Sequence, residues 1–330
     1  MKRVLVVKMS SLGDVIHTLP ALSDAAAARP GIRFDWVVEE AFAEIPGWHP
    51  SVDTVIPVAL RRWRKKPFRD FRGPEWRRAR SALARQRYDA VIDAQGLIKS
   101  AFIARLVKAP RYGLDRKSAR EGLASAVYHH RIAVPRDMHA VERTRQLFSR
   151  SLAYPVPTGP VNYGVDFSAP AAPDVPTLLF LHGTARQEKL WPEAHWRELL
   201  TLTVAAGYRV WLPWGSEGER ERALRIVGDT DSAEVLPPMS LSELAHRMLQ
   251  ARAAVAVDTG LGHLCAALDV PAVSLYGPTR TSLVGTCGAN QDHIESPLAG
   301  HGGIEGPAAM AAISPTAVWQ ALADLVDGED

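Results

Sequence analysis

Regular alternation of short apolar runs with helix-like segments is the feature of this 330-residue chain that most restricts its fold. In the first half we expect strands at residues 3–8, 33–38 and 89–94, and helices at 14–28, 74–87, 98–107 and 138–152. The apolar runs are continuous, which is typical of strands buried on both faces of a parallel sheet. The first half is therefore predicted to form a doubly wound α/β domain.

The alternation starts again after residues 153–176, a proline-rich stretch with little periodicity that we interpret as a linker. In the second half we expect strands at 177–182, 208–213, 233–236, 253–258 and 272–277, and helices at 192–207, 217–228, 240–251 and 261–268. We predict two Rossmann-like domains, residues 1–160 and 161–330, that face each other across a cleft. A last helix, at about 314–326, is compatible with packing on either half, the N-terminal domain included.

The composition excludes membrane-spanning and disulfide-rich classes of protein. Hydrophobic residues make up 47% and charged residues 23% of the chain, as in ordinary globular proteins. No run approaches the roughly 18 apolar residues that a bilayer span requires. The two cysteines, Cys265 and Cys287, form no metal-binding pattern and suit a reducing compartment, so we expect a cytoplasmic protein.

Positive charge is concentrated in one segment, although the formal net charge is only +3. Residues 61–87 contain twelve Lys and Arg against two acidic residues. Such a segment indicates an anionic partner, which could be a nucleic acid, an anionic lipid or a phosphorylated substrate. The alternative for residues 74–87 is a solvated amphipathic helix. No signature of a nucleic-acid-binding module accompanies the segment, so we expect no nucleic acid.

The stretch VDTGLGHL, residues 257–264, joins a predicted strand to a predicted helix. The first turn of a helix offers unpaired N–H groups and a partial positive charge, which favour a phosphate. Gly260 and Gly262 would allow a ligand to approach the backbone. The alternative is a tight turn in which Asp258 or Thr259 only caps the helix.

Three further segments of the second half carry candidate ligand-binding side chains. In the loop after residues 177–182, Thr184 and Lys189 could hold a diphosphate, or could simply be solvated. Glu219 could accept hydrogen bonds from ribose hydroxyls, or could stabilise the dipole of its own helix. Met239 could lie beside a flat base, or could be a core residue.

Asp14 occupies the helix start that follows the first strand, where a phosphate would sit in a nucleotide-binding domain. Its carboxylate would repel a phosphate, so the first half is not expected to hold the nucleotide. A carboxylate there could deprotonate an attacking hydroxyl group. The alternative is a first-turn acid that stabilises its helix by about 1 kcal/mol.

Several of these motifs, in this order, resemble the glycosyltransferase family 9 heptosyltransferases. They are VVKMSSLGDVIHTLPAL, FDWVVEEAFAEIPGWHP, RRWRKK, YDAVIDAQGLIKSA, HAVERT, LFLHGTARQEKLWPEAHWREL, LPPMSL and VAVDTGLGHLCAALDVPAVSLYGPT. The resemblance extends from about residue 2 to about residue 280. It implies a GT-B fold and transfer of L-glycero-D-manno-heptose from ADP-heptose to a Kdo sugar on lipid A, with inversion at the anomeric carbon.

The resemblance also implies roles for individual residues. Asp14 corresponds to the catalytic aspartate, and Lys189 to a lysine that binds phosphate and acts in catalysis. The implied donor-binding residues are Thr184, Lys189, Glu219, Met239, Asp258, Thr259, Gly260, Leu261 and His263. The expected acceptor-binding residues are Ser11, Gly13, Arg61, Arg62, Arg64, Lys65, Gln95, Lys99 and Arg120. Ala185 departs from the family, which often has a second hydroxyl residue there.

No Asp-x-Asp pattern stands in a suitable loop, so we expect no essential metal and no cofactor. We expect a monomer, peripheral on the cytoplasmic face of the inner membrane, because the implied acceptor is amphiphilic. One alternative is a related family member that uses the same donor on a heptose acceptor. The other is a non-enzymatic protein that binds nucleotides or nucleic acid.

Overall fold

The computed structural model of the chain describes residues 2–65, 73–168, 170–299 and 306–327. The chain divides into two compact units, Met1–Asp166 and Phe167–Asp330. The sequence placed the division after residue 160, within the same proline-rich stretch. The described residues between 153 and 176 form neither helix nor strand.

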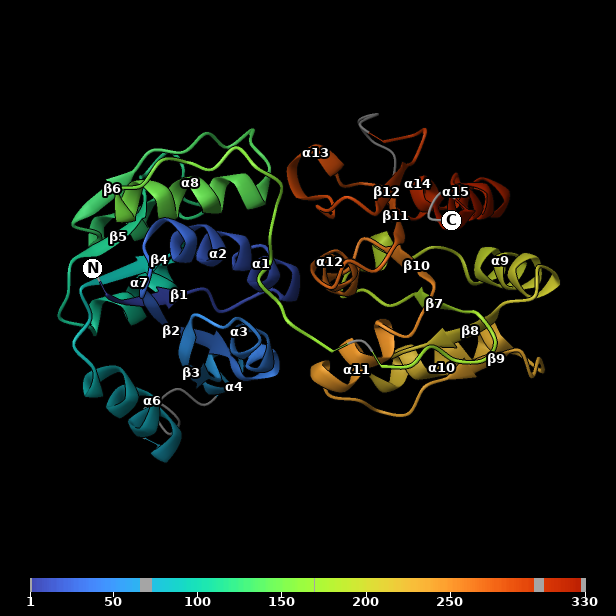
Figure 1. Cartoon of the computed structure of the whole chain (residues 1–330), viewed down its shortest axis with the longest axis horizontal. Helices are drawn as coiled ribbons and strands as arrows, with labels where there is room; N and C mark the ends of the chain where they lie inside the picture. The colour runs from blue at the N-terminus through green and yellow to red at the C-terminus, as the bar shows by residue number, and fades with distance from the viewer. Residues whose placement is uncertain (1, 66–72, 169, 300–305, 328–330) are drawn as a thin grey trace. The chain divides into compact units, whose positions relative to one another are not determined.

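The first unit is built on one parallel sheet (Figure 1). Its strands are β1 (Arg3–Val7), β2 (Arg33–Glu39), β3 (Val52–Val58), β4 (Ala90–Asp93), β5 (Arg111–Leu114) and β6 (His130–Ile132). Its helices are α1 (Leu12–Ile16), α2 (Leu19–Ala28), α3 (Glu44–Gly47), α4 (Leu60–Trp63), α6 (Pro74–Arg85), α7 (Ile98–Arg105) and α8 (Ala140–Leu152), with 3₁₀ turns η1 (Glu40–Phe42) and η2 (Gly122–Val127).

The strands of this sheet lie in the order β3-β2-β1-β4-β5-β6, the Rossmann order. All five pairings are parallel, and β1 lies in the middle, with Val4 opposite Phe34 on one side and Ala90 on the other. Helices α2 and α8 pack together, and Phe148 of α8 contacts Phe34. Helices α6 and α7 share a separate core with Leu5 and Val7 of β1. The sheet is therefore covered on both faces, as its continuous apolar runs require.

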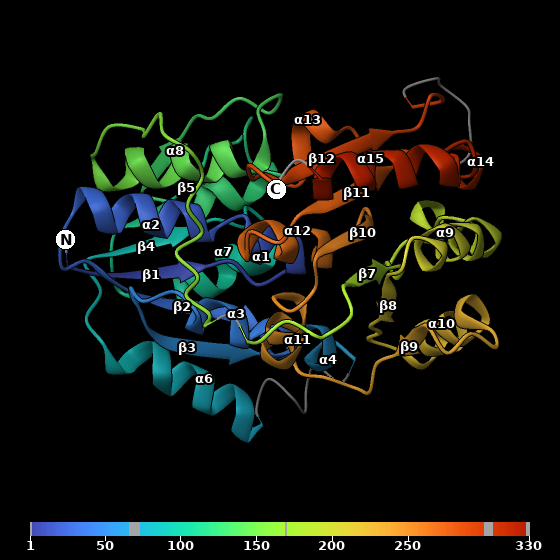
Figure 2. The ribbon, with the colours of Figure 1, turned by 45° about the vertical axis from the view of Figure 1, so that its right-hand side comes forward.

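The second unit repeats this plan (Figures 1 and 2). Its strands are β7 (Thr177–Leu181), β8 (Arg209–Leu212), β9 (Ala233–Val235), β10 (Ala253–Val257), β11 (Ala272–Tyr276) and β12 (Gln291–Glu295). Its helices are α9 (Glu193–Ala205), α10 (Glu217–Val227), α11 (Leu241–Met248), α12 (Gly260–Ala267), α13 (Thr281–Val284), α14 (Gly306–Ala311) and α15 (Pro315–Asp327), with the 3₁₀ turn η3 (Gln187–Lys189). The strand order is β12-β11-β10-β7-β8-β9, again parallel throughout and again the Rossmann order.

The sequence predicts one helix over residues 14–28 that Pro20 kinks after its first turns. This prediction is wrong, because the structure has two separate helices there. Helix α1 ends at Ile16 and α2 begins at Leu19. Pro20 has no N–H group to donate to the carbonyl of Ile16, so one continuous helix would lose a hydrogen bond there. The Thr18 hydroxyl instead donates to the carbonyl of Asp14 (3.0 Å). The break shortens α1 to little more than the turn that carries Asp14.

The sequence also missed four strands, β3, β5, β6 and β12. Strands β3, β6 and β12 lie at sheet edges, where one side lacks a partner strand. Exposed positions interrupt the apolar pattern of β3, where Pro57 is tolerated because an edge position need not donate. Strand β6 has only three residues, and β12 is mostly polar. Interior strand β5 has only four residues, which include Arg111 and Gly113. None of the four therefore has the continuous apolar run by which the buried strands were recognised.

The last predicted helix corresponds to α15, and the structure places it on the second unit rather than back on the first. Helix α15 contacts α9 and strands β10, β11 and β12. Its buried residues Val318, Leu322 and Val326 belong to one core cluster with Leu199 and Val255. The helix therefore completes one face of the second sheet.

Candidate active site

In each unit the chain order reverses at one position in the sheet, between β1 and β4 in the first and between β7 and β10 in the second. Ligands of doubly wound sheets bind beyond the carboxyl ends of the strands at this position. The segments after β1 and β4 carry Asp14 and Gln95, and those after β7 and β10 carry Thr184 and Asp258. Each unit therefore brings predicted site residues together at its own switch point.

Asp14 lies in the first turn of α1 and is held by two neighbours. One carboxylate oxygen accepts hydrogen bonds from the backbone N–H (2.9 Å) and the hydroxyl (2.8 Å) of Ser11. The other lies 3.3 Å from the ammonium of Lys8. The side chain of Asp14 remains 41% exposed, so a substrate hydroxyl could reach it.

The pKa of Asp14 is held well below its ordinary value. Burial alone would raise this pKa, but the Lys8 ammonium and the hydrogen bonds from Ser11 stabilise the carboxylate and outweigh burial. Asp14 is therefore ionised throughout the neutral range, as a proton acceptor must be. The same contacts would also be made by an acid that only stabilises the first turn of its helix. The geometry therefore allows both a catalytic and a helix-stabilising role for Asp14.

The turn before α1 is fixed by Gln95, which follows β4. The Gln95 side-chain oxygen accepts from the backbone N–H groups of Met9 (2.6 Å) and Ser10 (3.2 Å), and its amide donates to the Ser10 carbonyl. Lys8 also donates to the carbonyl of Ala94 (3.1 Å). Gln95 therefore has a local function in holding this turn, and its predicted contact with an acceptor stays a prediction.

Three residues that support this turn escaped the sequence reasoning, namely Lys8, Asp93 and Tyr128. Asp93 is fully buried and accepts from the Gln95 backbone N–H (2.9 Å) and the Tyr128 hydroxyl (2.7 Å). Burial raises the pKa of Asp93, although these hydrogen bonds oppose the rise. The sequence does carry a signal for Lys8 and Asp93, because they are charged residues at the ends of two apolar strands. Buried positions of this kind usually hold apolar residues.

The remaining acceptor-side residues also follow the carboxyl ends of strands in the first sheet. Arg61, Arg62, Arg64 and Lys65 follow β3, Lys99 follows β4, and Arg120 follows β5. The structure thus places them at the same edge as Ser11, Gly13 and Asp14. Residues 66–72, within the predicted basic segment 61–87, lie outside the described residues.

The basic segment is partly neutralised by acidic neighbours. Arg62 pairs with Glu40 (3.0 Å) and with Glu75 (2.9 Å), which raises the pKa of the guanidinium. The Arg61 guanidinium lies over the ring of Phe42. Arg64 and Lys65 are exposed. Arg62 is therefore less available to an anionic ligand than the sequence suggested.

In the second unit, Thr184, Lys189 and Asp258 are brought into direct contact. The Thr184 hydroxyl donates to the Asp258 carbonyl (3.1 Å), and the Lys189 ammonium lies 2.5 Å from the Asp258 carboxylate. Both charged side chains are largely buried, with 14% of Lys189 and 9% of Asp258 exposed. Asp258 thus anchors a cation beside the start of α12.

Helix α12 begins without a side-chain cap. Its N-cap residue, Thr259, makes no capping hydrogen bond, and Gly260 and Leu261 are only partly buried. Gly262 packs closely on the sheet, because a Cβ there would meet Ala256, Ser274 and Thr286 at 3.4 Å. The uncapped first N–H groups of α12 suit a phosphate. The charge of Lys189 is balanced by the Asp258 carboxylate, so the lysine would have to turn from Asp258 toward a bound diphosphate. His263 lies buried in the same turn.

Glu219 lies against the loop that follows β7. Its carboxylate accepts from the backbone N–H of Gly215 (2.7 Å), and a Cβ on Gly183 would come within 2.6 Å of it. Met239 is half-buried after β9, next to the capped start of α11 at Ser240. The predicted donor-side residues thus follow β7, β8, β9 and β10 at one edge of the second sheet.

His182 lies directly after β7. It is fully buried, and neither ring nitrogen makes a hydrogen bond of ordinary geometry among the described residues. Burial, helped by the nearby Arg222, lowers the pKa of His182 to about 4. His182 is therefore a neutral and incompletely satisfied side chain next to Gly183 and Thr184.

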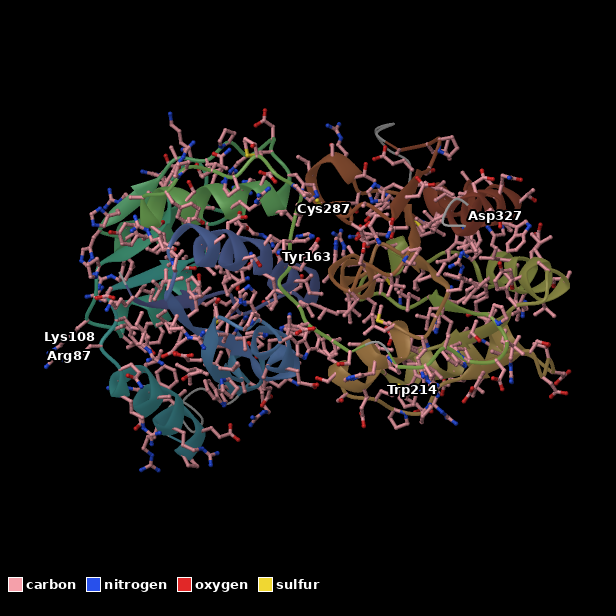
Figure 3. All side chains as sticks on the ribbon, viewed as in Figure 1. Arg87, Lys108, Tyr163, Trp214, Cys287 and Asp327 are labelled. Atoms are coloured by element: carbon pink, nitrogen blue, oxygen red, sulfur yellow. The ribbon has the colours of Figure 1, made fainter. Side chains whose placement is uncertain are left out.

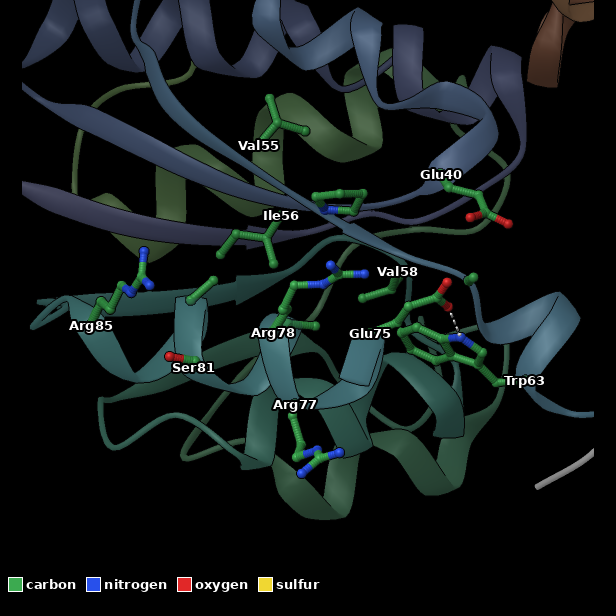
Figure 4. Close-up of a pocket in the computed structure, with 14 residues that line it drawn as sticks. Glu40, Val55, Ile56, Val58, Trp63, Glu75, Arg77, Arg78, Ser81 and Arg85 are labelled. Atoms are coloured by element: carbon green, nitrogen blue, oxygen red, sulfur yellow. Dashed lines mark hydrogen bonds between the residues drawn. The ribbon is translucent and has the colours of Figure 1, made fainter. Parts of the chain in front are cut away.

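One cavity of about 660 Å³ lies in the first unit between β3 and α6 (Figure 4). Val55, Ile56 and Val58 form its apolar wall, and Arg78 and Arg85 extend toward it from α6. It contains none of the switch-point residues, so it is not the candidate active site. No group of three or more His, Cys, Asp or Glu in the described part of the chain is arranged to hold a metal ion.

Two parallel six-stranded sheets of Rossmann order, each with polar residues at its switch point, form the GT-B fold. The profile of glycosyltransferase family 9 (heptosyltransferase) matches residues 76–301. The chain belongs to this family and is a glycosyltransferase.

Comparison with three relatives shows how closely this chain resembles individual members of the family. Lipopolysaccharide heptosyltransferase 1 of Pseudomonas aeruginosa is 58% identical over 297 residues, which cover 89% of this chain and 84% of that protein. Crystal structures of E. coli heptosyltransferase WaaC with ADP and with ADP-2-deoxy-2-fluoro heptose match with TM-scores of 0.89 and 0.86 at 46% identity, covering 98% of this chain and 99% of theirs. Lipopolysaccharide heptosyltransferase 2 of E. coli is 25% identical, covering 84% of this chain and 83% of that protein.

Proposed function

We propose that this chain is an inverting glycosyltransferase that transfers L-glycero-D-manno-heptose from ADP-heptose to a Kdo residue of Kdo-lipid A. The donor is supported by relatives that are named for heptosyl transfer and by the ADP-containing structures of E. coli WaaC. The observation that carries the proposal is the corner made by Lys189, Asp258 and the uncapped start of α12. The acceptor follows from the greater identity to heptosyltransferase 1 than to heptosyltransferase 2.

In this proposal the second unit holds the donor. The diphosphate accepts hydrogen bonds from the first N–H groups of α12 and from Lys189, and Thr184 supplies a hydroxyl donor. Glu219, whose carboxylate is already aligned by Gly215, accepts from the ribose hydroxyls. Met239 packs beside the adenine. Lys189, paired with Asp258 before the donor arrives, turns toward the diphosphate and stabilises the negative charge that develops there.

Asp14 of the first unit acts as the general base. It accepts the proton of the Kdo hydroxyl while that oxygen forms its bond to the anomeric carbon of heptose. The bond from that carbon to the β-phosphate oxygen breaks, and its electron pair leaves with ADP. Because its low pKa makes Asp14 a weak base, it takes the proton late, when the hydroxyl has become acidic through attack.

The acceptor side rests on cations at the same sheet edge as Asp14. Exposed Arg64 and Lys65 suit anionic groups of the acceptor, with Lys99 and Arg120 nearby in the topology. No helix among the described residues is long and apolar enough to cross a bilayer. Because the proposed acceptor is amphiphilic, we propose that the protein works at the cytoplasmic face of the inner membrane. We also propose that it works as a monomer, without a cofactor or an essential metal.

Release of ADP from ADP-heptose tests this function. We expect ADP release when Kdo-lipid A is present. We expect no release without an acceptor, and none with an acceptor that already carries heptose. Release only with the heptose-bearing acceptor would assign the activity to the heptosyltransferase 2 type. Loss of activity with EDTA, restored by Mg²⁺, would contradict the metal-independent mechanism.

A further inference from the structure

Exposed apolar side chains are concentrated on one helix and the adjoining turn. Six large hydrophobic side chains are exposed among the described residues, and four of them lie on α7, its C-cap and η2. They are Ile98 (54% exposed), Phe102 (49%), Leu106 (37%) and Leu123 (68%). None of the four belongs to a core cluster, although Phe102 also stacks on Trp76. Exposed apolar surface of this kind marks an interaction site.

The three residues of α7 form one stripe. At about 100° per residue, positions 98, 102 and 106 fall within an arc of roughly 80°. Turn η2, which carries Leu123, packs beside α7 through Ala101 and Ala124. We call Ile98, Phe102, Leu106 and Leu123 the α7 stripe.

Cations surround the α7 stripe. Arg105 projects from the same face of α7, and Lys108 follows the helix. Phe102 stacks on Trp76 of α6, which brings the arginines of α6 alongside, with Arg80 one turn beyond Trp76. Residues 73–123 contain twelve Lys and Arg against five Asp and Glu, although the whole chain has a net charge of only +3.

These cations are available to a partner. Among the described residues, no ion pair involves Arg80, Arg105 or Lys108, and all three are exposed. Figure 3 shows Lys108 and Arg87 extending outward from the ribbon beyond α7 and α6. One acid, Glu121, lies at the start of α7, where its carboxylate accepts from the backbone N–H of Ile98 (2.7 Å). The helix N-terminus offsets this negative charge.

We propose that the α7 stripe and its cations dock this protein on the surface of an anionic phospholipid bilayer. Aliphatic side chains ringed by Lys and Arg suit the boundary between anionic headgroups and hydrocarbon. A second copy would bring like charges together, and a nucleic acid offers no hydrocarbon to Ile98, Leu106 and Leu123. The surface differs from the segment 61–65 that is proposed for acceptor recognition, although Lys99 of α7 and Arg120 before η2, also proposed for the acceptor, adjoin it.

The position of the stripe connects docking to the proposed function, on which this link rests. Helix α7 starts three residues after Gln95, at the sheet edge that carries Asp14. Ile98 at the start of α7 lies at this edge, and Arg105 and Lys108 lie about 10 Å or more farther along, toward the opposite edge. A bilayer along α7 would therefore reach the edge where a lipid-linked acceptor must react only at its Ile98 end. Docking would keep the enzyme where its acceptor is concentrated.

Vesicle cosedimentation tests the surface with two double variants. The probes are phosphatidylcholine vesicles with and without about one-third phosphatidylglycerol. The wild-type protein should bind the anionic vesicles, and Arg105→Ala with Lys108→Ala should weaken binding about 30-fold. Ile98→Ser with Leu123→Ser should weaken it roughly tenfold. All four positions are exposed, so folding should be preserved, which circular dichroism checks.

Matched controls lie on the second unit. Leu224→Ser removes a similarly exposed apolar side chain (47%) from α10, and Arg209→Ala removes an exposed cation at the start of β8. Both should bind vesicles within about twofold of wild type. Equal wild-type binding to both vesicle types, or wild-type binding by both double variants, would overturn the proposal. Dimerisation of the wild type that the Ile98/Leu123 variant abolishes would also overturn it, in favour of a second copy.

Transfer assays separate this proposal from the proposed function. The double variants should keep wild-type kcat/KM on a deacylated, water-soluble Kdo acceptor and lose it on Kdo-lipid A in vesicles. Equal losses on both acceptors would contradict a docking role. If the wild-type protein transfers heptose to neither acceptor, the proposed function is refuted. The docking proposal would then be judged by vesicle binding alone.

Discussion

Replacing Lys8 by methionine should raise the pKa of Asp14 and move the acid limb of the pH–rate profile. The Lys8 ammonium lies 3.3 Å from the Asp14 carboxylate, and Asp14 is 41% exposed. At this distance Coulomb's law gives about 1.3 kcal/mol in water and about 5 kcal/mol at an effective dielectric constant of 20. Because Lys8 is buried and Asp14 is partly exposed, the interaction lies between these limits, and we expect an upward shift of at least about one pKa unit.

The sign of the effect follows from the direction of the shift in the folded enzyme. Asp14 works as a carboxylate, so kcat falls as the pH drops through its pKa. That pKa is depressed, so the wild-type enzyme should lose activity from this group only below about pH 4. Lys8→Met should move this limb up by at least about one unit and change kcat at neutral pH less than about tenfold.

The measurement is kcat against pH in saturating donor and acceptor, with circular dichroism to confirm folding at each pH. Lys2→Met, which removes an exposed lysine from the same end of the chain, is the control and should leave the limb in place. An unchanged acid limb in Lys8→Met would show that Lys8 does not set the pKa of the catalytic base, or that Asp14 is not that base.

Three further predictions concern the second unit. Lys189→Met should weaken ADP binding at least about tenfold and destabilise the unit by roughly 1–3 kcal/mol, since Asp258 is left buried and unpaired. Gly183→Ala should weaken ADP binding by displacing Glu219, whose carboxylate lies 2.6 Å from the added Cβ; calorimetry measures both affinities. His182→Phe should flatten the pH dependence of stability. In the wild type, the pKa of His182 is lowered from 6.5 in the unfolded chain to about 4 in the folded protein, so the free energy of unfolding should fall by about 3 kcal/mol as the pH drops from 6.5 toward 4. Urea denaturation at several pH values measures this loss, which the variant should lack.

Each of these has a control that separates binding from folding. Lys189→Met combined with Asp258→Asn should recover stability but not ADP affinity; recovery of affinity would mean that the lysine does not contact the diphosphate. Gly218→Ala, where a Cβ meets nothing within 4 Å, should leave ADP affinity unchanged. Exposed His246, replaced by glutamine, should leave the pH dependence as in wild type. An unaltered pH dependence in His182→Phe would contradict the buried neutral histidine.

The buried parts of the fold were predictable because parallel strands covered on both faces have continuous apolar runs. Strands β1, β7 and β10 were found for this reason. The edge strands β3 and β12 were not, since they have exposed or polar positions that no period of two or of 3.6 identifies. The helix break before Pro20 was misjudged as a kink, because the loss of one N–H group does not reveal how far the chain departs from helical geometry.

Within the candidate site, the sequence predicted where the functional residues lie in the fold but not which side chains pair with them. Loops after strands gave Asp14 and Lys189, since parallel strands bring their carboxyl ends to one edge. The partners of these residues, Lys8 and Asp258, depend on side-chain packing. Arg62 illustrates the limit, because neither of its carboxylate partners is its neighbour in sequence. The catalytic and binding roles themselves remain predictions that the following measurement addresses.

Turnover and donor affinity of Asp14→Asn test the central claim most directly. Asparagine keeps the shape of the side chain but cannot accept the hydroxyl proton. If Asp14 is the general base, kcat should fall about 10²–10⁴-fold while the Kd for ADP-heptose stays within about twofold. A kcat close to that of the wild type would contradict this account, and so would a loss of activity caused mainly by weaker donor binding.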